Sequence, residues 1–280
     1  MKLLNPGPLT DLSGLCIHTI TTKPFGIEEA ISKFSASGVS GISVWRDSYG
    51  RFSPRQVGEM IRRSGMKTVS LVRGGFFPSV DEDKRKASIK DNIDALREAS
   101  EMEAPLVVLV CGADPGQSIQ TSIDQIRAGL ESILPVAEKY NVKLAIEPLH
   151  PVYADTRSAI STMKQANDIA EEFGSPWLGI AVDVYHLWWD QDLEREIIRC
   201  GEGNRIFAFH VCDWKVPTTD ILLDRGLMGE GCINIPQIRQ WVNRSGFNGF
   251  NEVEIFSNIY WQTDQDEFLK RIIEAYKMHT

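Results

Sequence analysis

The sequence has few cysteines, and their arrangement excludes two classes of small protein. Only five of the 280 residues are cysteines, the number is odd, and no C-x-x-C pair occurs. A disulfide framework or a zinc ribbon would need paired and closely spaced cysteines. We therefore expect free thiols in a reducing compartment.

The sequence also has no run of about twenty apolar residues, which is the length of a transmembrane helix. Before its first prolines, the N-terminal segment 1–8 has no apolar stretch of signal-peptide length. The formal net charge is −8, which argues against a general affinity for nucleic acid or anionic membrane. These features predict a cytoplasmic protein that binds neither nucleic acid nor membrane.

The sequence does contain a regular alternation of short apolar runs and amphipathic stretches along its whole length. Parallel strands need helical crossovers, so this alternation predicts a closed (β/α)8 TIM barrel, with residues 1–280 as a single domain. An open doubly wound sheet is the alternative, although no G-x-G-x-x-G motif follows the first strand. The expected strands are 15–20, 41–45, 67–73, 106–111, 142–148, 177–183, 206–211 and 249–256. The expected helices are 26–37, 53–64, 81–102, 118–140 with a kink or a split at Pro135, 157–173, 193–200, 236–245 and 264–278, with a long loop at 214–232.

Polar residues stand at the carboxyl ends of the last four expected strands: Glu147, Asp183, His210 and Glu254. A charged side chain at the end of a buried strand is costly unless it is paired or binds a metal. In a (β/α)8 barrel these ends meet at one mouth, with neighbouring strands about 5 Å apart. Carboxylates with one imidazole suit a divalent cation. The pattern therefore predicts a metal site at the ends of strands five to eight.

Several segments resemble the sugar isomerase/epimerase-like TIM barrels, also described as xylose isomerase-like or sugar phosphate isomerase/epimerase-like. This superfamily includes ketose 3-epimerases and inosose dehydratase and, more distantly, xylose isomerase and apurinic endonucleases. The resembling segments are AIEPLHP at 145–151, VDVYH at 182–186, FHVCDW at 209–214, GEGCI at 229–233 and EVE at 252–254.

The resemblance implies a ligand set and a mechanism. Glu147, Asp183, His210 and Glu254 match the metal ligands of the ketose epimerases, whose metal is usually manganese, with magnesium, cobalt or zinc as alternatives. Glu147 and Glu254 match the acid/base pair of those enzymes. The implied chemistry is abstraction of a proton next to a carbonyl, through a metal-stabilised enediolate.

Other residues near these strand ends are candidates for the pocket. His186 has the spacing from Asp183 that the family uses for a substrate-contacting histidine. His150 lies between two prolines that stiffen its loop, and it is a candidate catalytic residue. We expect substrate contacts from Arg225, Trp188 and Asp213, with a loop ion pair as the alternative for Arg225 and a subunit contact for Trp188. Candidates at earlier strand ends are His18, Trp45 and Arg73.

The predicted function is a metal-dependent isomerase or epimerase of carbohydrate metabolism, forming a homo-oligomer and acting on a small sugar or oxo-sugar. Segment 211–216 lacks the arginine pattern of ketose 3-epimerases, so a lyase acting on an oxo-sugar is the main alternative. It would resemble inosose dehydratase, or the C-glycoside deglycosidase catalytic subunit, which works with a small partner subunit. An apurinic endonuclease would need further zinc-binding histidines and an Asp-x-His motif, which the sequence lacks. A non-catalytic sugar-binding barrel would not need four ligands.

Overall fold

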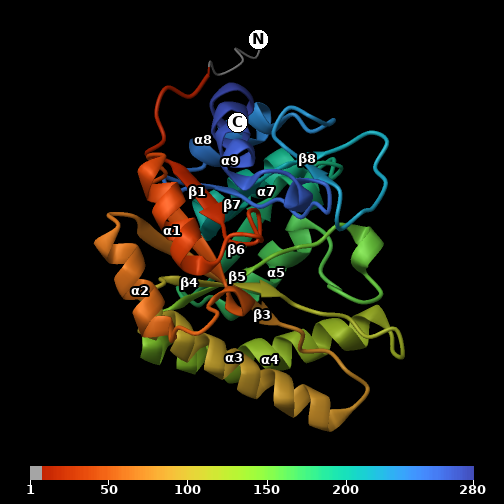
Figure 1. The fold of residues 1–280 in the computed structure, drawn as a ribbon. Helices are drawn as coiled ribbons and strands as arrows, with labels where there is room; N and C mark the ends of the chain where they lie inside the picture. The colour runs from red at the N-terminus through yellow and green to blue at the C-terminus, as the bar shows by residue number, and fades with distance from the viewer. Residues whose placement is uncertain (1–7) are drawn as a thin grey trace.

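The computed structural model describes residues 8–280 and confirms the (β/α)8 barrel as a single domain (Figure 1). The parallel strands close in the order β1-β10-β7-β6-β5-β4-β3-β2. The expectation about a signal segment falls largely on residues 1–7, which lie outside the described part. The barrel strands are β1 Leu15–His18, β2 Gly41–Trp45, β3 Lys67–Gly75, β4 Leu106–Val110, β5 Lys143–Ile146, β6 Leu178–Asp183, β7 Ile206–Val211 and β10 Asn251–Val253.

Helices connect the strands and cover the outside of the barrel, as Figure 1 shows for α3 and α4 along the lower side. Two helices begin with a capping box, in which a hydroxyl and a glutamine three residues later satisfy each other's backbone N–H groups: Ser53 with Gln56, and Thr162 with Gln165. None of the helices in residues 8–280 has the length and apolar character that a membrane span requires. The helices are α1 Ile27–Ala36, α2 Pro54–Arg63, α3 Glu82–Met102, α4 Ile119–Tyr140, α5 Met163–Phe173, α6 Val184–Leu187, α7 Leu193–Glu202, α8 Ile235–Arg244 and α9 Gln265–His279.

The barrel strands alternate between two apolar layers. In β4, Val107 and Leu109 belong to the large core, which includes buried residues of the surrounding helices. Leu106 and Val108 belong to a smaller core with Ala145 and other inward-facing strand residues. This period of two is the geometry of a pleated strand. It determines which side chains at the carboxyl ends point into the mouth.

Several expected boundaries were wrong. The helix expected from residue 157 begins at Met163, because residues 157–159 instead bond to Gly112 at the end of β4. The expected split at Pro135 is absent, since α4 is one helix through that residue. The last barrel strand is shorter than 249–256. The expected loop 214–232 contains part of a two-stranded ribbon, formed by β8 Asp213–Trp214 and β9 Arg225–Gly226.

Candidate metal centre at the carboxyl ends of the strands

The structure brings together the four side chains predicted to bind a metal. Glu147 directly follows β5, Asp183 ends β6, His210 lies near the end of β7, and Glu254 directly follows β10. Each offers a ligand atom, and these atoms lie within 4.8 Å of one another. All four residues are buried. Asp183 also accepts the N–H of Tyr185 through Oδ1 at 2.7 Å, which starts α6 and leaves Oδ2 facing the site.

Unpaired polar atoms at this point fit a bound cation. Both ring nitrogens of His210 and Oε1 of Glu147 are buried, and the geometric criteria for a hydrogen bond give them no partner among residues 8–280. His210 Nδ1 and Glu147 Oε1 lie 2.9 Å apart, which is the distance of an ion pair when the imidazole is protonated. Buried polar atoms are normally satisfied, so each such atom calls for a partner. A divalent cation that accepts carboxylate and imidazole ligands, such as Mn²⁺, Mg²⁺ or Zn²⁺, would provide one.

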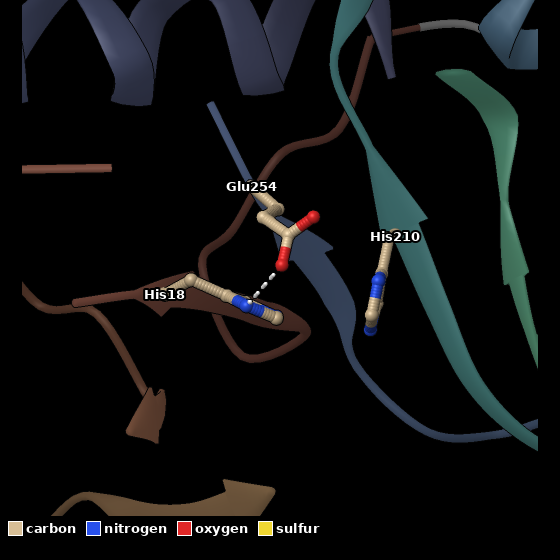
Figure 2. Close-up of side chains that lie close together, drawn as sticks. All are labelled: His18, His210 and Glu254. Atoms are coloured by element: carbon tan, nitrogen blue, oxygen red, sulfur yellow. Dashed lines mark ion pairs between the residues drawn. The ribbon is translucent and has the colours of Figure 1, made fainter. Parts of the chain in front are cut away.

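His18 at the end of β1 joins the same cluster (Figure 2). Its Nδ1 lies 3.0 Å from Glu254 Oε1, and its ring meets the His210 ring edge-on at a centroid distance of 4.7 Å. His18, His210 and Glu254 form a second group with the spacing of metal ligands. The sequence suggested only that His18 is near the mouth, and the structure adds its direct contact with Glu254.

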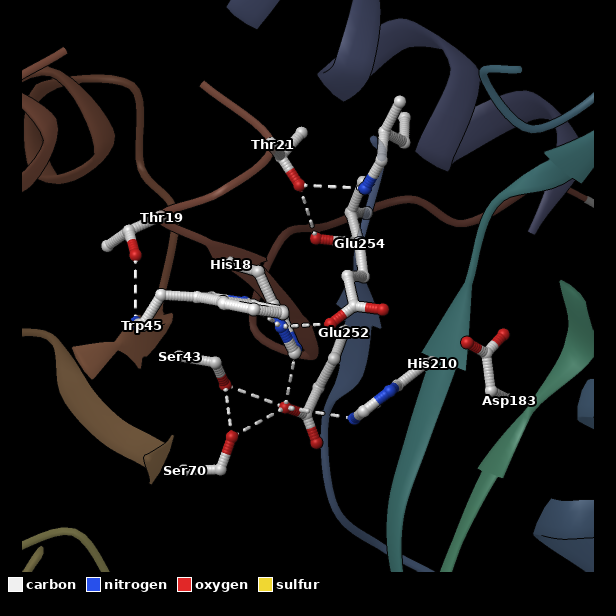
Figure 3. Close-up of polar contacts among 12 residues, drawn as sticks. His18, Thr19, Thr21, Ser43, Trp45, Ser70, Asp183, His210, Glu252 and Glu254 are labelled. Carbon is white, nitrogen blue, oxygen red and sulfur yellow. Dashed lines mark hydrogen bonds and ion pairs between the residues drawn. The ribbon is translucent and has the colours of Figure 1, made fainter. Parts of the chain in front are cut away.

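A buried polar layer that includes Glu252 supports the cluster (Figure 3). Glu252 Oε2 accepts the hydroxyls of Ser43 at 2.7 Å and Ser70 at 3.3 Å, and it lies 3.1 Å from His18 Nε2. Glu252 was not among the predicted site residues. The signal was present, because residues two apart on a strand face the same side, and Glu254 was already expected to face inward.

Charge in this layer is balanced around His18. Burial disfavours its imidazolium, but the carboxylates of Glu254 and Glu252 outweigh burial and raise the pKa of His18. Burial also acts to raise the pKa of each glutamate. The partners of Glu252, with His18 first, outweigh burial and lower its pKa. For Glu254, the charges of His18, Arg225 and His210 hold the pKa below its usual range. A cationic His18 between two carboxylates therefore fixes both glutamates.

Replacing Glu252 with glutamine should destabilise the metal-free protein by about 3 kcal/mol, because the change leaves a buried His18 cation without one of its anions. Chemical denaturation would measure the loss. Ser70→Ala removes a hydrogen bond to Ser43 and a longer one of 3.3 Å to the Glu252 carboxylate but leaves the ion pair with His18 in place, and it should cost about 1 kcal/mol. The stabilisation that the Glu252 carboxylate provides is lost as the pH falls below the usual glutamate pKa of 4.5, and the stabilisation that the His18 cation provides is lost as the pH rises above the usual histidine pKa of 6.5. The difference in stability loss between Glu252→Gln and Ser70→Ala should therefore be largest between these two pH values. An equal loss for both variants would contradict the ion pair.

Arg225, expected to contact substrate, extends from β9 into the centre. Its Nη1 lies 3.0 Å from Glu254 Oε2 and 3.5 Å from Asp183 Oδ2. The guanidinium stacks on the rings of Tyr185 and Phe256, at 4.4 and 4.9 Å from their centroids. The alternative of an ion pair within the loop is not what the structure shows, since both carboxylates belong to the metal cluster.

The two candidate histidines that follow strand ends differ in burial. His186 is buried on α6, and its Nε2 lies 3.2 Å from Arg225 Nη2. Burial and the charge of Arg225 lower the pKa of His186 well below its ordinary value, so the ring is neutral. His150 is partly buried and packs its ring near Trp189 and Trp214. Its Nδ1 accepts the N–H of Val152, so only Nε2 remains available.

Two further candidates lie outside the immediate pocket wall. The carboxylate of Asp213 is buried and accepts the backbone N–H groups of Trp214, Gly229 and Ile233 at 2.9 to 3.0 Å. It therefore organises the loop after β9. Trp188 is 36% exposed, and its ring packs against Trp214. Their expected substrate contacts remain predictions.

The pocket above the cluster is narrow, with about 10 Å³ of open volume. The segment before β9 covers it. The hydroxyls of Tyr153 and Tyr185 donate to the carbonyl of Ile221 at 2.9 and 2.6 Å, and Leu222 lines the pocket. A larger cavity of about 520 Å³ lies at the opposite end of the barrel, away from the clustered ligands. Other residues that line the narrow pocket are Trp45, Val72, Val110, Leu149, Arg157 and Phe256.

A comparison with known protein families shows to which of them the chain is related. Residues 31–273 match the family described as xylose isomerase-like TIM barrel. The chain belongs to this family. The resemblance expected from the five sequence segments is therefore confirmed.

Individual proteins and solved structures show different degrees of similarity to this chain. The crystal structure of protein SMc04130 from Sinorhizobium meliloti 1021 is 40% identical, with a TM-score of 0.92 over 96% of this chain and 100% of that one. An inosose isomerase from Halalkalibacterium halodurans is 27% identical over 213 residues, which is 73% of this chain and 72% of the relative. A structure of the IolI protein with a bound zinc atom shares the fold, at 19% identity and a TM-score of 0.82 over 94% of this chain and 96% of that one.

Proposed function

We propose that this protein is a divalent-metal-dependent isomerase or epimerase that moves a proton next to the carbonyl of a small sugar or cyclic oxo-sugar. The observation that carries the proposal is the cluster of Glu147, Asp183, His210 and Glu254, with ligand atoms within 4.8 Å of one another. The similarity to an inosose isomerase supports a substrate of this class.

The residues of the cluster have two roles, metal binding and proton transfer. A divalent cation, manganese in first place, would be held by all four and would polarise the substrate carbonyl, which acidifies the neighbouring C–H group. Glu254 is kept as a carboxylate by His18 and Arg225, which is the ionised form that a general base needs. Glu147 lies across the cluster and would return a proton to the substrate.

Arg225 and His186 are suited to orient the substrate rather than to react with it. Their adjoining side chains line the pocket, and the neutral imidazole and the guanidinium offer hydrogen bonds to sugar oxygens. Because the open volume is only about 10 Å³, a sugar must displace the segment that contains Leu222. Binding would therefore couple to movement of the loop between β8 and β9.

His186→Ala should raise KM about tenfold and change kcat less, because it removes a hydrogen bond made in the ground state as well as in the transition state. Steady-state kinetics on the substrate found in the screen below would measure both constants. His279→Ala, at an exposed position on α9, is the matched control. A loss confined to kcat would instead assign His186 to proton transfer.

A screen of candidate sugars tests the proposed function and identifies the substrate in the same experiment. Ketoses, inososes and 3-oxo-glycosides, together with phosphate esters and keto-acids of the ketoses, would be incubated with the Mn²⁺-loaded protein in D₂O and followed by NMR. Exchange of the hydrogen next to the carbonyl would support the proposal, and the product would separate a stereoisomer or a shifted carbonyl from a dehydrated sugar or a freed aglycone. Absence of exchange and of product across the panel, with Mn²⁺, Mg²⁺, Co²⁺ and Zn²⁺, would overturn it.

A further inference from the structure

Arg73 occupies a bulge at the mouth of the barrel. In the pairing of β3 with β4, Val72 lies opposite Val108 and Gly74 lies opposite Leu109, so Arg73 has no partner in the register. Bulges of this kind redirect a side chain and are common beside active sites. The guanidinium of Arg73 stacks on the ring of Phe76, at 4.2 Å from the centroid.

Arg157 approaches the same place from the other side of β4. It lines the narrow pocket together with Glu147 and Val72. Its carbonyl accepts the N–H of Gly112, just beyond β4, at 2.8 Å, while the N–H of Phe76 bonds to Val110 at the end of the same strand at 2.8 Å. The segments that carry the two arginines are thus tied to one strand end.

Neither guanidinium has a protein anion as its partner. Among residues 8–280, Arg73 and Arg157 form no ion pair and no side-chain hydrogen bond, although both lie partly buried. Burial and the charge of Arg157 lower the pKa of Arg73, which indicates that the two cations repel each other. Guanidinium N–H groups without a protein partner can bind a planar or tetrahedral anion, and here the two guanidiniums belong to segments bonded to the same strand end.

We propose that Arg73 and Arg157 form a subsite for an anionic group of the substrate, so that the proposed isomerase or epimerase acts on a sugar phosphate or a sugar acid rather than on a neutral sugar. This inference rests on the proposed function for the reaction itself. The anion would bind at the ends of β3 and β4, while the carbonyl end of the same molecule reaches Glu147 and Glu254.

Turnover of matched substrates tests the subsite. A ketose, its terminal phosphate ester and the corresponding keto-acid would be compared for the wild type, Arg73→Gln and Arg157→Gln, with the exposed Arg55→Gln on α2 as control. We expect an anionic form to be preferred at least about a hundredfold in kcat/KM. Arg73→Gln and Arg157→Gln should each lose about ten- to a hundredfold in kcat/KM on that form, through KM, and clearly less on the neutral ketose. Preference for the phosphate or for the acid identifies the anion.

A binding measurement separates failure of the subsite from failure of the reaction. Inorganic phosphate and acetate would be titrated calorimetrically into the metal-free protein. At least one anion should bind to the wild type and to Arg55→Gln, and about tenfold more weakly to Arg73→Gln and Arg157→Gln, even if no sugar is turned over. Equal anion binding by all four proteins, no anion binding by the wild type, or equal turnover of neutral and anionic substrates would overturn the subsite and leave the proposed reaction standing.

Discussion

Replacement of Glu254 by glutamine is expected to lower kcat by about a thousandfold, because an amide cannot accept the proton that the carboxylate removes. The same change at Glu147 should lower kcat by a similar factor through loss of the returning acid. Each variant should also retain metal less well, since each removes a charged ligand. Kinetics and elemental analysis of the purified variants would measure the two effects.

Glu131→Gln provides the matched control, because Glu131 is an exposed residue of α4 far from the strand ends along the chain. Circular dichroism should show folded protein for all three variants, since the apolar core lies between the strands and the surrounding helices. Turnover that survives in folded Glu254→Gln would show that the proton is removed by another group, and it would remove the central role that we assign to this carboxylate.

The different effects expected of Glu252 and Glu254 variants follow from their places on one strand. Glu254 reaches the ligand cluster, whereas Glu252, two residues earlier, bonds to Ser43, Ser70 and His18 inside the barrel. Loss of Glu254 should affect catalysis directly, and it should also destabilise the metal-free protein, because Glu254 is paired with His18 and Arg225. Loss of Glu252 should mainly affect stability, and it should affect catalysis only through the position of His18.

The sequence predicted the parts of the site that depend on a local pattern. Glu147, Asp183, His210 and Glu254 each end an apolar run, and parallel strands all end on the same side of a barrel. This was sufficient to predict their convergence. The contact of His18 with Glu254 was not predictable in this way, because it exists only after β1 and β10 pair to close the barrel.

The sequence was less informative about the loops. Arg157 stood at the start of the expected helix 157–173, but its backbone bonds to Gly112 instead and delays the helix until Met163. Arg225 lay in an expected loop, and the sequence did not indicate where its side chain would point. The β8–β9 ribbon directs this side chain toward the cluster, where it pairs with Glu254. Both outcomes depend on long-range hydrogen bonds, which leave no periodic signal in the sequence.

Removal of the metal by a chelator is expected to abolish turnover, and addition of Mn²⁺ should restore it, because a divalent cation held by the four clustered side chains would supply the polarisation of the carbonyl. Metal binding should also release protons. Burial works against the His210 imidazolium, but Glu147, Glu252 and Glu254 raise its pKa to about 10 in the metal-free protein. Burial raises the pKa of Asp183 to about 7. A cation needs the neutral imidazole and the ionised carboxylate.

The sign of the pH dependence follows from these two groups. Above pH 7 only His210 must lose a proton, so metal affinity should rise about tenfold per pH unit. Below pH 7 both groups must lose one, so affinity should change by about a hundredfold per unit. Calorimetry in buffers of different ionisation enthalpy would count the protons directly. Asp183→Asn should bind metal more weakly and show the shallower slope throughout, because its side chain does not titrate. Metal binding that is independent of pH between 6 and 8 would contradict the proton release that we expect from His210 and Asp183, and turnover that is unchanged after chelation would exclude the metal from the reaction.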